Sequence, residues 1–242
     1  MNIDRNTTVG ELAASVNGAV RLFERLQIDY CCGGKRPLEE VCREKNLGVD
    51  EVVAALQTIN DVQPAGGDRD WTAASLSELA QHIVTRHHAF VRREIPRITA
   101  LLTKICEVHG ERRPEFLKVR EHWDELTAEL DHHLTKEERI LFPYIEQLEN
   151  ASRGSGEQVP APFGSVRYPI QMMMNEHDSA GHLLATMQGL LTDRSGCNTC
   201  LEFFRSLDGF EKDLHQHIHL ENNILFPRAE RLETAVGPGQ FA

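Results

Sequence analysis

Hydrophobic positions recur every three to four residues along most of this chain, which is the spacing of one face of an α-helix. A break occurs near DVQPAGGDRD at 61–70, where this periodicity stops and Pro and Gly appear. After the break the pattern predicts four long amphipathic helices, at about 75–107, 114–149, 166–192 and 199–233. No segment alternates like a strand, so the predicted fold is all-α and contains a four-helix bundle.

Three shorter helices are predicted before the break. They span roughly 9–26, roughly 37–46, and a segment that begins after Asp50, which we expect to be its N-cap. The expected organisation is therefore a small N-terminal helical domain at 1–62, a linker at 63–74 and the bundle at 75–236.

The interior seam of the second long helix is interrupted by polar residues. Its apolar positions pass through Leu126 and Leu130 and continue at Ile140. His133 and Glu137 occupy the positions in between, which face the bundle interior by the same spacing.

The fourth long helix repeats this arrangement. DHHLTKEERILFPYIEQLE (131–149) and HQHIHLENNILFPRAERLE (215–233) align without a gap, and His217 and Glu221 take the matching positions. The same test of phase selects His88 in the first helix and His177 in the third. We expect the remaining histidines on the surface or the flanks of helices: His82, His87, His109, His122, His132, His182, His215 and His219.

Four imidazoles and two carboxylates are costly inside a bundle unless they are paired or bind cations. The residues therefore predict a site for two metal ions, with two bridging glutamates, two histidines on each ion and open positions for a small ligand. Such ligands suit iron or manganese, and affinity order alone does not exclude zinc or copper. Glu129 and Asp213, one turn before His133 and His217, and Glu176, beside His177, are expected to support or tune the site.

The six cysteines do not suggest a disulfide framework. Cys31 and Cys32 are adjacent, a spacing that forms a disulfide only with strain. They are either two small residues at a helix end or thiols that capture iron, nitrosyl groups or a partner's thiol. Cys197 and Cys200 form a CxxC in a predicted loop, which we interpret as incidental because no second CxxC completes a zinc site.

Composition and charge narrow the partners. The 242 residues are 40% hydrophobic, as in ordinary globular proteins, and the net charge of −11 argues against broad nucleic-acid binding. No stretch approaches the roughly 18 apolar residues of a membrane span, and the N-terminus lacks a hydrophobic signal segment. We expect a cytoplasmic protein with no nucleic-acid or membrane partner.

The sequence resembles two known types of domain. The paired HxxxE…LFP segments, NEHDSAG around His177 and RHH around His88 resemble the hemerythrin-like di-iron domain. DYCCGGK at 29–35 resembles the short N-terminal domain of the iron-sulfur cluster repair proteins, the RIC or ScdA/YtfE-type family. Together the two resemblances cover nearly the whole chain.

The resemblance implies a hemerythrin-like bundle that carries two non-haem iron ions per chain. It implies a homodimer that restores damaged iron-sulfur proteins by iron donation, binds nitric oxide at the di-iron centre, and uses Cys31 and Cys32 in thiol or iron transfer. Carried over to this sequence, the iron ligands are His88, His133, Glu137, His177, His217 and Glu221.

Two other classes of function stay open at the same site. One is an enzyme that reduces nitric oxide or oxygen, and the other is a module that scavenges or senses a diatomic gas. Oxygen-carrying hemerythrins have a further histidine and an aspartate in different spacing, so an oxygen-carrier role is not favoured. A ferritin-like oxidase is disfavoured because that fold uses ExxH spacing.

Overall fold

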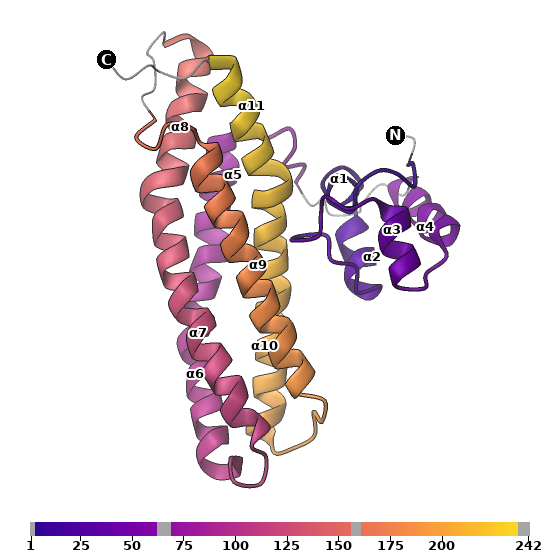
Figure 1. The fold of residues 1–242 in the computed structure, drawn as a ribbon, viewed down its shortest axis with the longest axis vertical. Coiled ribbons are helices and arrows are strands. Elements are labelled where there is room, and N and C mark those ends of the chain that lie inside the picture. The colour runs from indigo at the N-terminus through magenta and orange to yellow at the C-terminus, as the bar shows by residue number, and fades with distance from the viewer. Residues whose placement is uncertain (1–2, 62–68, 156–160, 237–242) are drawn as a thin grey trace.

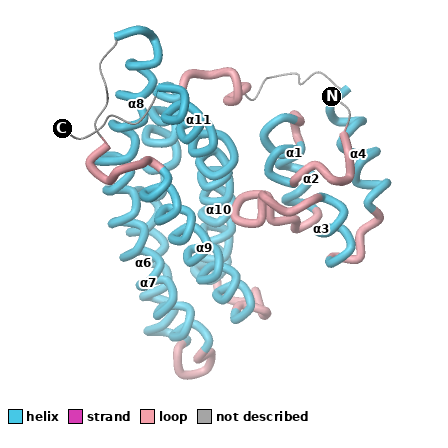
Figure 2. The backbone as a smooth tube through the Cα atoms, turned by 45° about the horizontal axis from the view of Figure 1, so that its top comes forward, coloured by secondary structure: helices cyan, strands magenta, loops and turns pink. Residues whose placement is uncertain are grey.

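The computed structural model describes residues 3–61, 69–155 and 161–236, and these residues form helices joined by loops (Figures 1 and 2). Within these ranges there is no strand, only an isolated bridge between Thr8 and Pro37. The predicted all-α fold is confirmed. Residues 62–68, which include part of the predicted linker, lie outside the described residues, and the predicted domain boundaries stay predictions.

The small domain, residues 3–61, contains α1 (Val9–Ser15), α2 (Ala19–Arg25), α3 (Leu38–Glu44) and α4 (Val49–Asp61). The single helix predicted at 9–26 is divided into α1 and α2, because Val16 is extended and Gly18 has a φ of 82°, a conformation that favours glycine. The predicted N-cap at Asp50 is also wrong, since Asp50 lies within the first turn of α4.

Four long helical stretches form the bundle, and each overlaps its predicted range. Their elements are α5 (Leu76–His82), η1 (Ile83–His88) and α6 (Ala89–His109); α7 (Glu115–Lys136), η2 (Glu137–Leu141), α8 (Phe142–Asn150) and η3 (Ala151–Ser155); α9 (Arg167–Leu190); and α10 (Asn198–His219), η4 (Leu220–Leu225) and α11 (Phe226–Val236). In Figure 1 the stretches run side by side, with the small domain beside α9 and α10.

The segments η1, η2 and η4 are turns of π-helix, which widen the helix and shift the phase of every following residue. The shift explains one wrong position in the predicted seam: Ile140 is 50% exposed, whereas Leu141 is 1% exposed. Both η2 and η4 end just before a Phe-Pro pair. A proline has no N–H and its ring collides with the preceding turn, so a widened turn accommodates Pro143 and Pro227.

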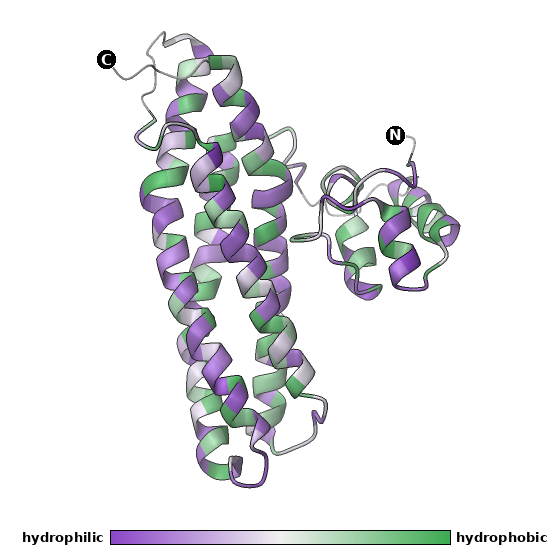
Figure 3. Cartoon of the chain, in the orientation of Figure 1, coloured by the Kyte–Doolittle hydropathy of each residue, from purple (hydrophilic) through white to green (hydrophobic). Residues whose placement is uncertain are grey.

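The apolar core consists of two regions. One includes Trp123, Leu184 and Phe210 and continues into the small domain, and the other lies at the α8–α11 end of the bundle and includes Tyr144 and Leu225. Hydrophilic and hydrophobic residues are interspersed along the bundle helices (Figure 3). Among the described residues, no helix has the length and apolar character needed to cross a membrane.

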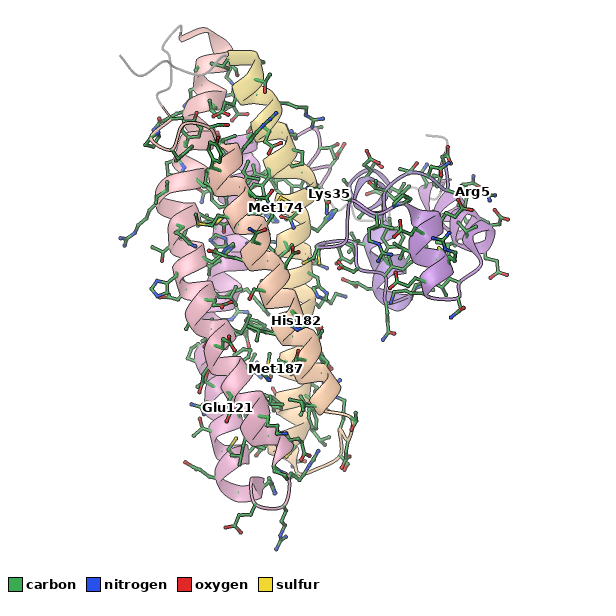
Figure 4. The ribbon with its side chains drawn as sticks, in the orientation of Figure 1. Arg5, Lys35, Glu121, Met174, His182 and Met187 are labelled. Atoms are coloured by element: carbon green, nitrogen blue, oxygen red, sulfur yellow. The ribbon has the colours of Figure 1, made fainter. Side chains whose placement is uncertain are left out.

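The small domain contacts the bundle through α1, which packs against η4 and α10, and through the loop between α2 and α3. Figure 4 shows Lys35 of this loop on the side that faces the bundle and Arg5 on the outer side. Asn223 of η4 donates a hydrogen bond to the Tyr30 carbonyl oxygen at 2.9 Å. A Cβ at Gly34 would lie 2.5 Å from the Asn223 side-chain oxygen, so this close approach requires glycine.

A buried carboxylate holds the start of the first bundle helix. Glu149 of α8, 8% exposed, accepts hydrogen bonds from the backbone N–H groups of Leu76 and Ser77 at 2.9 and 3.1 Å. Burial raises the pKa of this carboxyl, but the hydrogen bonds from Ser77 and Leu76 outweigh burial and lower it.

We expect Glu149→Ala to reduce the free energy of unfolding by about 1–3 kcal/mol, because the substitution leaves buried N–H groups without an acceptor. Denaturant unfolding followed by circular dichroism measures the change. Glu146→Ala on the same helix removes an exposed carboxylate and should stay within about 0.5 kcal/mol of the wild type. Equal effects of the two substitutions would contradict the role of Glu149.

The contribution of Glu149 should also depend on pH. Since its pKa is lower in the folded chain than in the unfolded chain, the contribution is complete above the ordinary carboxyl pKa of about 4. It is lost as the pH falls through the folded-state pKa. The stability difference between the wild type and Glu149→Ala should therefore narrow on acidification.

Candidate metal centre

Six side chains from the four long stretches meet between the two apolar regions of the bundle. They form two groups that share both glutamates, and the candidate ligand atoms of each group lie within 4.8 Å of one another. Group one is His88, Glu137, His217 and Glu221, and group two is His133, Glu137, His177 and Glu221. All six residues are at most 3% exposed. Two such groups with shared carboxylates are consistent with a site for two metal ions.

The imidazole rings face one another in pairs through their Nε2 atoms. The Nε2 atoms of His88 and His217 are 3.1 Å apart, and those of His133 and His177 are also 3.1 Å apart. Metal–nitrogen bonds of about 2.0–2.1 Å place two adjacent nitrogen ligands of one ion roughly 3 Å apart. Each pair therefore has the spacing of two ligands on one ion.

The shared glutamates lie between the two pairs. Glu137 Oε2 is 3.4 Å from the Nε2 atoms of both His88 and His133. Glu221 directs Oε1 to His217 Nε2 at 3.0 Å and Oε2 to His177 Nε2 at 3.2 Å. Each carboxylate thus reaches one histidine of each group, as a bridging ligand does.

Glu137 gives the clearest test of whether metal ions fit here. Its carboxylate is fully buried, and neither oxygen has a hydrogen-bond partner in the described part of the chain. Burial, followed by the negative charge of Glu221, raises the pKa of Glu137 to about 8. A buried carboxylate without donors costs several kcal/mol or more, and divalent cations would supply both the missing partners and the positive charge. The residues fit metal ions.

The other carboxylate and the histidines are electrostatically unequal. Burial raises the pKa of Glu221, but His217 and His177 outweigh it and hold the pKa well below its usual range. Burial lowers the pKa of His217 to about 4, so this imidazole is neutral near pH 7, the form that binds a metal ion. Burial also lowers the pKa of His177, but Glu221 outweighs burial and raises it to about 9, so this ring must release its proton to bind an ion.

The Nδ1 atoms of two of the histidines are held by residues that follow the shared glutamates. His88 Nδ1 donates to Glu138 at 2.7 Å, and His177 Nδ1 donates to the Asn222 side-chain oxygen at 2.9 Å. Such partners fix the orientation of a metal-binding ring and leave its Nε2 lone pair for the ion. Sequence reasoning missed Glu138 and Asn222, although they occupy equivalent positions in the gapless repeat.

Of the three carboxylates expected to support the site, Glu176 contacts a histidine of it. Glu176 accepts from His133 Nδ1 at 2.8 Å and pairs with Lys136. Burial raises its pKa, but the His133 and Lys136 interactions lower the pKa to about 2. Glu129 instead accepts a hydrogen bond from Ser179 at 3.1 Å.

Asp213 pairs with His87, not with His217 one turn later. The distance from His87 Nδ1 to Asp213 Oδ2 is 3.0 Å, and the His87 ring stacks on His217 with centroids 5.8 Å apart. His87 and His219, expected on the surface or the flanks, are both buried. Tyr30 of the small domain covers His219, a contact that the periodicity of the bundle cannot reveal.

The loop that carries Cys31 and Cys32 lies against the His177 side of the site. Asn222 donates from its amide nitrogen to the Cys31 carbonyl oxygen at 3.3 Å, and Cys32 Sγ is 3.6 Å from the His177 carbonyl oxygen. The two thiols are free, with their sulfur atoms 3.8 Å apart. Together with Asp29 they form a further group that could hold a metal ion.

A cleft of about 590 Å³ opens beside these thiols, between the small domain and the bundle. Its lining includes Asp29, Cys31 and Cys32 from the small domain. Asp178 and His182 line it from α9. Of the two thiols in its wall, Cys31 is buried and Cys32 is partly exposed.

Comparison with known proteins accounts for both parts of the chain. Residues 79–229 match the family described as Hemerythrin HHE cation binding domain, and residues 5–60 match ScdA_N, described as a domain of unknown function.

Similar proteins extend over almost the same length. The iron-sulfur cluster repair protein YtfE of Pectobacterium carotovorum is 37% identical over 95% of this chain and 99% of its own. YtfE of Escherichia coli strain SMS-3-5 is 36% identical over 93% and 97%. A probable iron-sulfur cluster repair protein of Haemophilus influenzae is 34% identical over 91% and 95%. The expected resemblance is confirmed, and the chain belongs to the YtfE family of iron-sulfur cluster repair proteins, which joins an ScdA_N domain to a hemerythrin HHE domain.

Proposed function

We propose that this protein restores iron-sulfur clusters damaged by nitrosative or oxidative stress, and that it does so by donating iron from a di-iron centre. The observation that carries the proposal is the pair of buried groups that share Glu137 and Glu221, with two free thiols beside one of them. The names of the similar proteins, which are iron-sulfur cluster repair proteins, point to the same role.

One iron would be held by His88 and His217 and the other by His133 and His177, with Glu137 and Glu221 bridging both. Two ferrous ions carry four positive charges, and four carboxylates oppose them: the two bridges, together with Glu138 and Glu176 on the far sides of two rings. Neutral imidazole supplies the remaining ligands. The small number of protein ligands on each ion keeps the iron exchangeable, as donation requires.

The contacts of the loop suggest which iron leaves first. Both the Asn222 bridge and the Cys32 sulfur reach His177, so the His133–His177 half of the centre lies nearer the thiols. Cys31, Cys32 and Asp29 would then receive the iron at the wall of the cleft. The hydrogen bond with Cys32, followed by burial, raises the pKa of Cys31, so iron capture there must release a proton.

Nitric oxide is the proposed ligand of the same half of the centre, where a small cavity lies beside His133 and His177. The space is about 10 Å³, room for at most about one water molecule, and its other lining residues are Glu129, Leu130, Glu176, Ala180, Leu214 and Ile218. Reduction of nitric oxide or oxygen at this position is the second candidate function. Turnover of nitric oxide with an electron donor, instead of stoichiometric binding, would favour it.

Assembly as a homodimer and a cytoplasmic location remain predictions.

We expect about two iron ions per chain in protein purified without oxygen, and a loss of iron in His133→Ala and His217→Ala. Each substitution removes one of the two imidazoles on an ion, so iron content should fall to one ion or none, and cluster repair should fall with it. Elemental analysis after iron reconstitution measures the content. His132→Ala removes an exposed neighbouring imidazole and should keep both ions. Full iron content and repair in His133→Ala would rule out the assigned ligands.

The thiol pair should be needed for repair but not for holding iron. In a protein with Cys31→Ser and Cys32→Ser together, we expect two irons per chain but strongly reduced repair of a damaged cluster. Cys106→Ser removes a half-buried thiol elsewhere and serves as the control. Unchanged repair in the double variant would show that Cys31 and Cys32 have only a structural role, and it would leave the assignment of the iron ligands in the bundle unaffected.

A further inference from the structure

Two thiols and one imidazole, all able to bind a metal ion, meet at the end of the bundle that lies away from α8 and α11. Cys197 is the N-cap of α10, Cys200 lies in its first turn, and His109 is the last residue of α6. The α6–α7 and α9–α10 loops lie together at the lower end of the bundle in Figure 1. The sequence placed the CxxC in a loop and His109 on a flank, but α10 begins at Asn198, so Cys200 belongs to the helix.

The distances among these three side chains fit a tetrahedral metal ion. Cys197 Sγ is 3.6 Å from Cys200 Sγ and 3.5 Å from His109 Nε2, and all three atoms lie within 4.8 Å of one another. Zinc bonds of about 2.3 Å to sulfur and about 2.0–2.1 Å to nitrogen give tetrahedral edges of roughly 3.8 Å between sulfurs and roughly 3.6 Å between sulfur and nitrogen. Two edges are thus already in place.

The segment before Cys197 is fixed in position. The Arg113 guanidinium donates hydrogen bonds to the carbonyl oxygens of Ser195 and Asp193 at 2.8 and 2.5 Å. Gly196 has a φ of 150°, and a Cβ there would lie 2.8 Å from the Cys200 Cβ. The chain can therefore pass closely over the Cys200 thiol only because residue 196 is glycine.

The burial of the three side chains suits an ion that is held by the protein on one side and reached from solvent on the other. Cys200 is buried, His109 is half-buried and Cys197 is exposed. The backbone N–H of Cys200, followed by the His109 ring and the Cys200 thiol, lowers the pKa of Cys197 to about 6. A large fraction of Cys197 is therefore thiolate near pH 7, the form that binds metals.

We propose that His109, Cys197 and Cys200 form a mononuclear site for a thiophilic divalent ion such as zinc, separate from the centre between the four helices. The fourth position is open to water or an external ligand, as in three-ligand zinc sites. Two thiolates make this site softer than the imidazole and carboxylate centre, so the two sites prefer different metals. A bound ion joins the end of α6 to the start of α10.

Cobalt(II) tests this proposal, because thiolate-to-cobalt charge-transfer absorption arises only where sulfur binds the ion. The titration uses the reduced full chain without oxygen, with the bundle centre already loaded with iron and with Cys31→Ser and Cys32→Ser in place, because the thiols of the small domain could also bind cobalt. We expect about one cobalt per chain with tetrahedral, thiolate-type absorption, and we expect zinc to displace it. The absorption should be lost in Cys197→Ser and in Cys200→Ser. In His109→Ala the affinity for cobalt should fall at least about tenfold.

The variants also distinguish this site from the thiols of the small domain. The combined Cys31→Ser and Cys32→Ser variant should keep the absorption, and His132→Ala should leave it unchanged. Because Cys197 is exposed, Cys197→Ser should keep the wild-type circular dichroism and its two irons, so a loss of absorption there reports the ligand itself.

Three results would overturn the proposal. The first is a full absorption in Cys197→Ser, and the second is an absorption that disappears with Cys31 and Cys32. The third combines two observations: the reduced protein binds no cobalt, and Cys197 and Cys200 form a disulfide when the same protein is exposed to air. That last result would instead identify the pair as a redox dithiol.

Discussion

The carboxylates of Glu137 and Glu221 determine the organisation of the bundle. Both are fully buried, and both oxygens of Glu137 lack a hydrogen-bond donor among the described residues. An apolar bundle would be less costly to form without them. The four stretches bring imidazoles to these oxygens, an arrangement consistent with a site for two metal ions. The polar layer divides the core into two apolar regions, and three of the π-helical turns, η1, η2 and η4, contain residues of this layer.

The internal repeat explains how one sequence pattern builds two halves of a centre. In each copy the glutamate lies between the histidine pairs, and the next residue holds a histidine of another helix by its Nδ1 atom. The copies differ at that next residue. Glu138 is anionic and also pairs with Arg92, whereas Asn222 is neutral and contacts the small domain. In the half with Asn222 the anionic Glu176 holds the other histidine, His133. In the half with Glu138 the Nδ1 atom of His217 has no hydrogen-bond partner among the described residues. The two halves of the centre are therefore chemically unequal, and the thiols lie next to the half that contains Asn222.

Sequence periodicity was sufficient to predict the all-α fold. It was also sufficient to choose six inward-facing residues that the structure brings together, because a polar residue stands out where the spacing of the apolar seam predicts an apolar one. It failed where the helix departs from 3.6 residues per turn, as at Ile140 within η2. It also failed where a contact depends on tertiary packing. Asp213 is one turn from His217 yet pairs with His87, and His219 is covered by Tyr30 of another domain. The His109–Cys197–Cys200 group joins residues far apart in the sequence, a proximity that only the folded bundle creates.

The Asn222 side chain uses both of its ends, and this has a thermodynamic consequence. Its oxygen accepts a hydrogen bond from the N–H at His177 Nδ1, while its nitrogen donates a hydrogen bond to the Cys31 carbonyl oxygen. An amide turned by 180° would satisfy neither neighbour, so the seated small domain and the His177 tautomer with a free Nε2 stabilise each other. In the proposed di-iron centre this coupling would be reciprocal: whatever free energy the seated domain adds to iron binding, bound iron would add to the seating of the domain. Under that proposal, loss of iron from His177 would loosen the loop that carries Cys31 and Cys32.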